Sequence, residues 1–294
     1  MTQYRTIEKI IQNPPRHWVG NGFNVQQYFP SSMGMKFMER FSPFIMMDYN
    51  AEVSFKGTTE DVGVDAHPHR GFETVTFALK GKVEHGDNHG HSGIIEEGDI
   101  QWMTAGSGVL HKEFHEKEWA KQDRLFQMIQ LWVNLPAKDK MTQPNYQALK
   151  KDEITHFVDE KSGASIILYA GELFNHIGIA HTFSPMNIYR IELKAGQSIT
   201  LNEPSHFNLG FLIIKGDLNI NENVNANKEN FILFNNEEGE VKIDAISDSE
   251  IFVLSGQPLN EPVAAGGPFV MNTEKELRQA YVDYQHGLFG SFDF

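Results

Sequence analysis

The sequence of 294 residues contains no cysteine. This absence excludes disulfide bonds, thiolate metal ligands, iron–sulfur clusters and a cysteine nucleophile, and it is consistent with a reducing compartment. Any metal ion would be held by imidazole nitrogens and carboxylate oxygens, a ligand set that disfavours Cu(I).

Long apolar runs are also missing. No uninterrupted apolar stretch approaches the roughly 20 residues that a membrane-spanning helix needs. The first residues (MTQYR) do not show the basic start and apolar run of a signal peptide. We therefore expect a cytoplasmic protein with no membrane association.

Positive charge is scarce: 25 lysines and arginines face 39 aspartates and glutamates, which gives a formal net charge of −14. Proteins that bind nucleic acid usually present a basic face to the phosphates. Direct nucleic-acid binding is therefore not expected, and any contact with DNA would require a partner protein.

The residues that are present favour short β-strands. Residues 72–79, 100–103 and 125–134 are rich in β-branched and aromatic side chains, and each run is bounded by glycine- or proline-containing turns. Closely spaced strands of this kind predict an all-β protein built from barrels or sandwiches.

The length exceeds what one small core usually needs, so two domains are expected. A polar stretch rich in lysine, glutamine and aspartate separates two more apolar halves. We predict an N-terminal metal-binding domain over residues 1–136, a linker over 137–161 and a C-terminal domain over 162–294.

Two residue pairs have the spacing of alternate positions on a strand: His67 with His69, and His111 with Glu113. Alternate strand residues point to the same face, so each pair can converge on one point. Three imidazoles and a carboxylate are a ligand set for a divalent first-row metal. The two pairs therefore predict a single metal site between neighbouring strands.

The second half repeats the first weakly, because residues 77–83 resemble residues 212–218 at an offset of 135. The same offset carries the first histidine pair onto Asn202 and Pro204, which cannot replace imidazoles. His206 lies nearby but alone, as an ordinary hydrogen-bonded or exposed side chain would. The second copy is therefore expected to hold no metal.

One helix is well signalled near the C-terminus. Thr273 and Glu276 form a capping box, and Gly287 supplies the stop. Its apolar stripe consists of Leu277, Ala280, Tyr281 and Tyr284. The stripe predicts a helix that docks onto the rest of the fold.

The stretches 67–93, 98–114 and 266–290 resemble the signature segments of the pirin family, which belongs to the cupin superfamily. This resemblance implies two stacked cupin domains, each an antiparallel β-barrel, with metal in the N-terminal one only. It also implies His67, His69, His111 and Glu113 as the ligands. The family metal is usually iron, so Fe(II) is expected, although Mn, Cu, Ni, Co or Zn would fit the same ligands.

The fourth ligand has a competitor. Cupins commonly carry a glutamate four positions after the second histidine of the pair, and Glu73 stands at that distance from His69. The resemblance favours Glu113 as the ligand and leaves Glu73 as an acceptor that orients a ligand imidazole. Lys112, where many relatives have serine, alternates away from the metal face and lies near the expected pocket mouth.

Other residues near these pairs have two interpretations. His85, His89 and His91 form a second metal site or, as we prefer, an exposed hairpin loop. Trp102 and Met103 line a pocket beside the ligands or belong to the core.

Some pirins act as quercetin 2,3-dioxygenases and others are described as transcriptional co-regulators or regulators of metabolic enzymes. The enzyme interpretation implies a flavonol and O2 as substrates, with Glu113 or Glu73 as the base that takes the flavonol proton. The alternative is a redox-sensitive, iron-binding regulator that acts on a protein partner. A structural bicupin with an incidental metal is a third interpretation.

Overall fold

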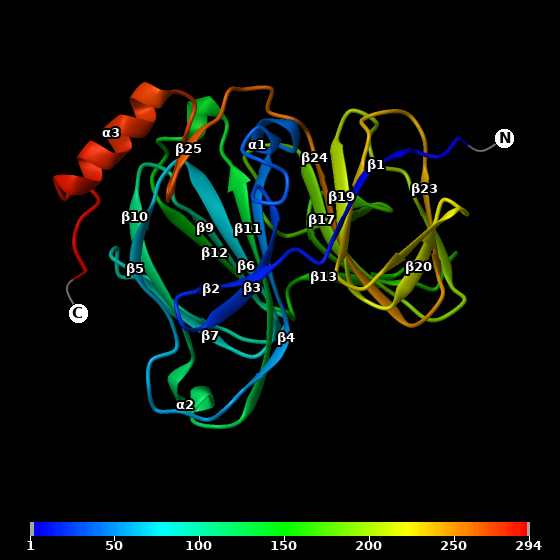
Figure 1. Cartoon of the computed structure of the whole chain (residues 1–294), viewed down its shortest axis with the longest axis horizontal. Helices are drawn as coiled ribbons and strands as arrows, with labels where there is room; N and C mark the ends of the chain where they lie inside the picture. The colour runs from blue at the N-terminus through cyan, green and yellow to red at the C-terminus, as the bar shows by residue number, and fades with distance from the viewer. Residues whose placement is uncertain (1–2, 293–294) are drawn as a thin grey trace. The chain divides into compact units, whose positions relative to one another are not determined.

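The computed structural model describes residues 3–292, and most of them lie in β-strands (Figure 1). The chain forms two compact units. The histidine-bearing unit contains residues 15–39, 43–151 and 259 onward, whereas the second unit contains residues up to 14, 40–42 and 152–258. The all-β fold class expected from the sequence is confirmed.

The histidine-bearing unit contains thirteen of the described strands and most of the helical segments. Its elements are β2 (Arg16–Val19), β3 (Phe23–Phe29), most of α1 (Phe37–Arg40), β4 (Phe44–Phe55), β5 (Gly63–His69), β6 (Phe72–Lys80), β7 (Val83–Asp87), β8 (Ser92–Ile95), β9 (Ile100–Thr104), β10 (Val109–His115), α2 (Lys117–Ala120), β11 (Arg124–Asn134), the 3-10 helix η1 (Ala137–Asp139), β12 (Asn145–Leu149), β25 (Ala264–Gly266), β26 (Phe269–Met271) and α3 (Glu274–Gln285).

The second unit is built from strands. They are β1 (Ile7–Gln12), β13 (Thr155–Val158), β14 (Ser165–Ala170), β15 (Glu172–Leu173), β16 (His176–Ile177), β17 (Met186–Leu193), β18 (Ser198–Leu201), β19 (Asn208–Lys215), β20 (Asp217–Ile220), β21 (Val224–Asn227), β22 (Asn230–Phe234), β23 (Val241–Ala245) and β24 (Ser249–Gly256).

Each unit pairs a seven-stranded antiparallel sheet with a four-stranded one. The sheets run β12-β9-β6-β11-β4-β3-β2 and β5-β10-β7-β8 in the histidine-bearing unit, and β1-β22-β19-β24-β17-β14-β13 and β18-β23-β20-β21 in the second unit. Two facing antiparallel sheets are the cupin architecture that the resemblance to the pirin family implied. The repeated segments correspond to β6 and β19, which occupy equivalent central places in the two larger sheets.

The predicted strands are confirmed in place. β6, β9 and β11 cover the three apolar runs, and each lies inside the seven-stranded sheet rather than at its edge. Every residue of β6 except the last is buried. A strand that is covered on both faces has a continuous apolar sequence instead of a clean alternation.

The segment expected to be a linker contributes strands to both units. β12 pairs with β9 in the histidine-bearing unit, and β13 pairs with β14 in the second unit. Both strands are the outermost members of their sheets. Because an edge strand has a free side that faces solvent, its sequence can be polar, and the composition of residues 137–161 therefore resembled that of a linker.

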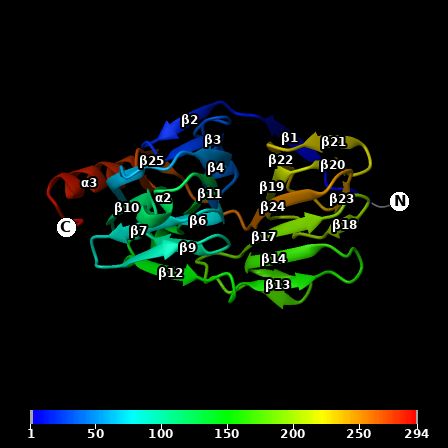
Figure 2. The same ribbon diagram turned by 90° about the horizontal axis from the view of Figure 1, so that it is seen from below.

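The two chain ends also depart from the expected bounds of 1–136 and 162–294. β1 pairs with β22 and so belongs to the second unit (Figure 2). α3 packs on β25 and β26 in the histidine-bearing unit, not in a C-terminal domain. Its capping box is present: Thr273 accepts from the Glu276 backbone, and Glu276 accepts from the Thr273 backbone.

The two units differ in what fills the inner face of their four-stranded sheets. In the second unit this face is apolar and fully buried, with residues such as Ile199, Leu218 and Ile243 in one continuous core. In the histidine-bearing unit, the equivalent sheet carries the histidine pair of β5 and the His111–Glu113 pair of β10. None of the helices in residues 3–292 combines the length and apolar character that a membrane span requires.

Candidate metal centre

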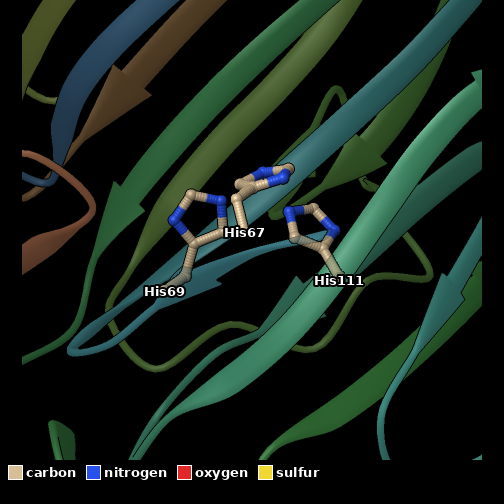
Figure 3. A group of neighbouring side chains, drawn as sticks. All are labelled: His67, His69 and His111. Atoms are coloured by element: carbon tan, nitrogen blue, oxygen red, sulfur yellow. The ribbon is translucent and has the colours of Figure 1, made fainter. Parts of the chain in front are cut away.

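The three histidines lie on two adjacent antiparallel strands. β5 carries His67 and His69, and β10 carries His111 directly opposite His67. Residues that face each other across an antiparallel pair have neighbouring side chains. The i, i+2 spacing and the strand pairing therefore bring the three rings together, as Figure 3 shows.

The three rings converge on one small volume. Their potential ligand nitrogens all lie within 4.8 Å of one another. The ring centroids are 4.3 Å apart for His67 and His111, and 4.8 Å apart for His69 with either of the others. One metal ion at a normal nitrogen–metal distance of about 2.1 Å can contact all three.

Burial disfavours protonation of these imidazoles. Only 4% of His69 and 1% of His111 are exposed. Burial lowers the pKa of both rings well below the usual value, and the neighbouring His67 lowers it further. Burial also lowers the pKa of His67, against the opposing effect of its hydrogen bond with the Asp65 carbonyl at 2.8 Å. A neutral imidazole keeps the nitrogen lone pair that a metal ligand requires.

The buried nitrogens also lack other partners. Within residues 3–292, Nδ1 of His69 and both ring nitrogens of His111 have no hydrogen-bond partner. Leaving buried polar atoms unsatisfied costs on the order of 1–3 kcal/mol each. Coordination by a cation would satisfy these nitrogens, so the donor set fits a transition metal.

Glu113 lies on the same face of β10 as His111 but outside the three-histidine group. Its carboxylate accepts a hydrogen bond from the Thr76 hydroxyl at 3.1 Å, and the residue is 7% exposed. Burial raises the pKa of Glu113 to about 7, and the hydrogen bond from Thr76 opposes this shift. The structure therefore places a buried carboxylate two positions along β10 from His111.

Glu73 faces the other way. The Thr76 hydroxyl points to Glu113, and Glu73 lies three residues from Thr76 on a regularly paired strand, hence on the opposite face. Its carboxylate accepts from the Thr104 hydroxyl at 2.7 Å. Burial raises the pKa of Glu73 to about 7, with Thr104 and Trp102 opposing the shift.

Glu73 is an even number of residues from His67 and His69, so an unbroken strand would place all three on one face, but the structure does not. The chain turns at Arg70 and Gly71, where Gly71 has φ +87°, so the histidines end one strand and Glu73 begins another. Parity counted through a turn does not predict a shared face. Glu73 is placed neither as a ligand nor as an acceptor for a ligand imidazole.

The two residues expected to line a pocket, Trp102 and Met103, lie on opposite faces of the seven-stranded sheet. Trp102 is paired with Val75 in the sheet, so it shares the face of Glu73, and it is fully buried. Met103 lies on the inner face, where its sulfur accepts from the Tyr146 hydroxyl at 2.9 Å. Of the two, only Met103 is directed toward the side of the sheet that Glu113 occupies.

The preferred interpretation of the second histidine cluster needs a correction. His85 is not in a loop: it lies in β7, paired with Glu113 across the sheet. Its Nδ1 is 2.7 Å from the Gln101 amide nitrogen, and its ring stacks on Tyr146 at a centroid distance of 5.6 Å. His89 and His91 are exposed in the following turn, as expected.

Gln101 and Tyr146 were missed by sequence reasoning, as was the inward position of His85. The available signal was the alternation of Val83, His85 and Asp87 between the flanking turns, because period two places all three on one face. Asp87 is fully buried, and one carboxylate oxygen lies 2.9 Å from His91 Nδ1. Within residues 3–292, these groups do not join the histidine cluster.

Lys112 points away from the metal face, as its parity predicted. It is partly exposed, and its ammonium lies 5.5 Å from the centre of the Phe292 ring. In the second unit, Asn202, Pro204 and His206 are all exposed. The one cluster of three ligand-type side chains found in the described part of the chain is the histidine group of β5 and β10.

Models of known protein families match both halves of the chain. The family model described as Pirin matches residues 22–133, and the model described as Pirin C-terminal cupin domain matches residues 188–290. A pirin-like protein of Solanum lycopersicum is 37% identical over 259 residues, which cover 87% of this chain and 84% of that protein.

Solved structures with the same fold include a quercetin 2,3-dioxygenase from Acinetobacter baumannii. Its TM-score is 0.93 at 42% identity, over 98% of this chain and 99% of that chain. The bacterial pirin YhhW from Escherichia coli, solved in complex with nickel(II), has a TM-score of 0.63 at 21% identity over 85% of this chain and 100% of that chain.

Proposed function

Because the chain belongs to the pirin family, we propose that it is a metal-dependent dioxygenase, with Fe(II) as its metal, that opens the heterocyclic ring of flavonols such as quercetin. The observation that carries this proposal is the convergence of three histidines on one small volume, where Nδ1 of His69 and both ring nitrogens of His111 are buried without a hydrogen-bond partner in the described residues. The similarity to the quercetin 2,3-dioxygenase of A. baumannii supports the choice of reaction.

We assign His67, His69 and His111 as three metal ligands and Glu113 as the carboxylate that completes the set. An iron bound there would supply Lewis acidity and a template that orients substrate and dioxygen. Mn, Cu, Ni, Co and Zn are also compatible with imidazole and carboxylate ligands. Elemental analysis of protein purified without added metal tests the choice of iron.

The surrounding side chains hold the ligands in place. The ring of His69 packs edge-on against Phe72 and Trp132, at centroid distances of 5.1 and 5.3 Å. These contacts limit rotation of the imidazole and exclude water from one side of it.

Glu113 is the proposed base. It is buried on the inner face beside the histidines, and the hydrogen bond from Thr76 restrains it there. In this position its carboxylate can take the proton of a flavonol hydroxyl, which leaves the substrate as the enolate. Glu73, whose carboxylate is turned to the opposite face, is not proposed for this step.

The test is oxygen consumption by iron-loaded protein supplied with quercetin. We expect a modest rate that disappears in His69→Ala, together with one iron per chain in the wild type. His206→Ala, which changes an exposed histidine of the second unit, is the matched control and should keep both metal and activity. Oxygen traces equal to those of buffer, across several flavonols, would reject the enzyme proposal.

A second function is favoured by the Solanum lycopersicum relative, which is named a pirin-like protein and not an enzyme. In this alternative the same site binds iron without turnover, and its charge change between Fe(II) and Fe(III) alters the affinity for a protein partner, such as a transcription factor. Stoichiometric iron binding without oxygen consumption would favour this role.

A further inference from the structure

The chain returns to the histidine-bearing unit after residue 258, and this return segment, residues 259–292, is built onto the end of β5. Arg70, the residue after His69, donates its backbone N–H to the Pro268 carbonyl at 3.3 Å. Its own carbonyl accepts from the Val270 N–H at 3.0 Å. The peptide next to His69 is therefore held on both sides by the return segment.

The side chain of Arg70 makes a second connection, to α3. Its Nη1 lies 2.6 Å from Oδ2 of Asp283, and only 6% and 16% of the two side chains are exposed. Nε donates to the Ser107 carbonyl at 2.7 Å, and the guanidinium lies 4.5 Å from the centre of the Phe289 ring. A planar guanidinium with three such partners has one favourable orientation.

A second arm of the return segment reaches β10. The Asn88 side chain donates to the Phe289 carbonyl at 2.5 Å and accepts from the Leu110 N–H at 2.9 Å. Leu110 directly precedes His111. The Phe289 ring also lies against Gly108, where an added Cβ would come within 2.9 Å of it.

We propose that Asp283 and Phe289 are positioning residues for the metal ligands. Asp283 acts on His69 through Arg70, and Phe289 acts on His111 through Asn88 and Leu110. The inference rests on the proposed metal site, because it assigns to these residues the task of keeping β5 and β10 in the register that brings the histidines together.

The physical reason is the precision that coordination requires. A metal site needs its ligands within about 0.5 Å of the productive geometry, and the histidines occupy the last positions of β5, where a strand is most free to move. The return segment fixes both the end of β5 and the start of β10. Loss of outer partners of this kind typically weakens metal affinity about 10- to 100-fold.

The test is cobalt(II) binding to metal-free protein, followed by the visible absorption of the bound ion and by competition with a chelator. Asp283→Asn should weaken the affinity about tenfold or more and change the absorption spectrum, because the ligands become less ordered. Asp283→Glu, which retains the charge, should keep most of the cobalt affinity and most of the wild-type absorption spectrum. A purely structural role would lower the melting temperature of the metal-free protein without altering the spectrum of the bound ion.

The matched control is Glu250→Gln in the second unit, which removes another half-buried ion pair, with Arg190 at 3.2 Å. It should leave cobalt binding unchanged. If Asp283→Asn does not fold, Phe289→Leu provides the same test, since it keeps an apolar side chain but removes the ring beneath Arg70. Wild-type affinity and spectrum in the folded variant would overturn the positioning role. Failure of the wild type to bind cobalt would instead overturn the metal site and, with it, the inference.

Discussion

At the scale of single residues, the site depends on which polar groups are buried without a partner. The three histidines are gathered in a position where protonation is disfavoured and, in the described chain, several ring nitrogens lack a hydrogen bond. Glu73 and Glu113 are both buried, and burial raises the pKa of each to about 7, so burial does not distinguish them. The face of the strand does.

The first prediction compares the two glutamates. Glu113→Gln should reduce metal affinity by about tenfold or more, because an anionic group beside the histidines is lost. Glu73→Gln should leave metal affinity close to that of the wild type, since its carboxylate faces Thr104. Isothermal titration with Fe(II) or Co(II) measures both. A larger loss for Glu73→Gln would return the ligand position to Glu73.

The second prediction concerns His115, which is 2% exposed. Its Nδ1 accepts from Arg124 Nε at 3.1 Å, and Nε2 donates to the Gly22 carbonyl at 3.1 Å, so the ring is satisfied only when neutral. Burial, assisted by the Arg124 charge and opposed by the Gly22 hydrogen bond, lowers the pKa of His115 to about 4.

Between pH 6.5 and 4, His115 is therefore protonated in the unfolded state but remains neutral in the folded state. The free energy of unfolding should fall by up to about 3 kcal/mol as the pH drops through this range. In His115→Gln this contribution to the pH dependence of the free energy of unfolding should be absent. Denaturant unfolding of metal-free protein at several pH values measures the difference, and parallel pH profiles for the two proteins would contradict the assignment.

At the scale of elements, strand ends and helix ends decide where the site residues lie. The turn at Gly71 separates the histidine strand from the strand of Glu73, so the even spacing between Glu73 and the histidines does not put them on one face. The capping box of α3 fixes where that helix begins. The helix then places Leu277 and Ala280 in a buried cluster with Phe269 and Phe289.

The third prediction tests this cap. Thr273→Ala removes the hydroxyl that accepts from the Glu276 N–H at 3.2 Å and should destabilise the histidine-bearing unit by about 1 kcal/mol. Thr273→Ser keeps the acceptor and is the control. Urea unfolding of both variants gives the comparison, and equal stability of the two would show that the box does not contribute.

At the scale of the whole molecule, two units of similar architecture have different interiors. The second unit has a continuous apolar core, whereas the first encloses polar groups that need a ligand. Because the histidine-bearing unit also has a large apolar core of its own, metal should add stability to a fold that exists without it.

The fourth prediction follows from this difference. Chelation by EDTA should lower the melting temperature of the histidine-bearing unit by roughly 5–10 °C by mass action, and the far-ultraviolet circular dichroism at 25 °C should remain that of a β-protein. His111→Ala is the control and should show no response to EDTA. Complete unfolding in EDTA would mean that the metal is required for folding.

Much of this architecture is determined by local sequence. The strands β6, β9 and β11, the cap of α3 and the convergence of His67 with His69 all follow from side-chain periodicity and hydrogen-bonding patterns that act over a few residues. The 135-residue offset predicted that the second half repeats the strand pattern of the first. None of these features depends on which distant strand becomes a neighbour.

Tertiary structure decided the rest, because it depends on pairing between distant segments. Strand pairing placed β1 in the second unit and brought His85 opposite Glu113. Packing on β25 and β26 placed α3 in the histidine-bearing unit. The turn at Gly71 set the face of Glu73, and the return segment placed Asp283 beside Arg70 at a separation of 213 residues. The sequence determined which side chains could form a metal site, and the fold decided which of them meet.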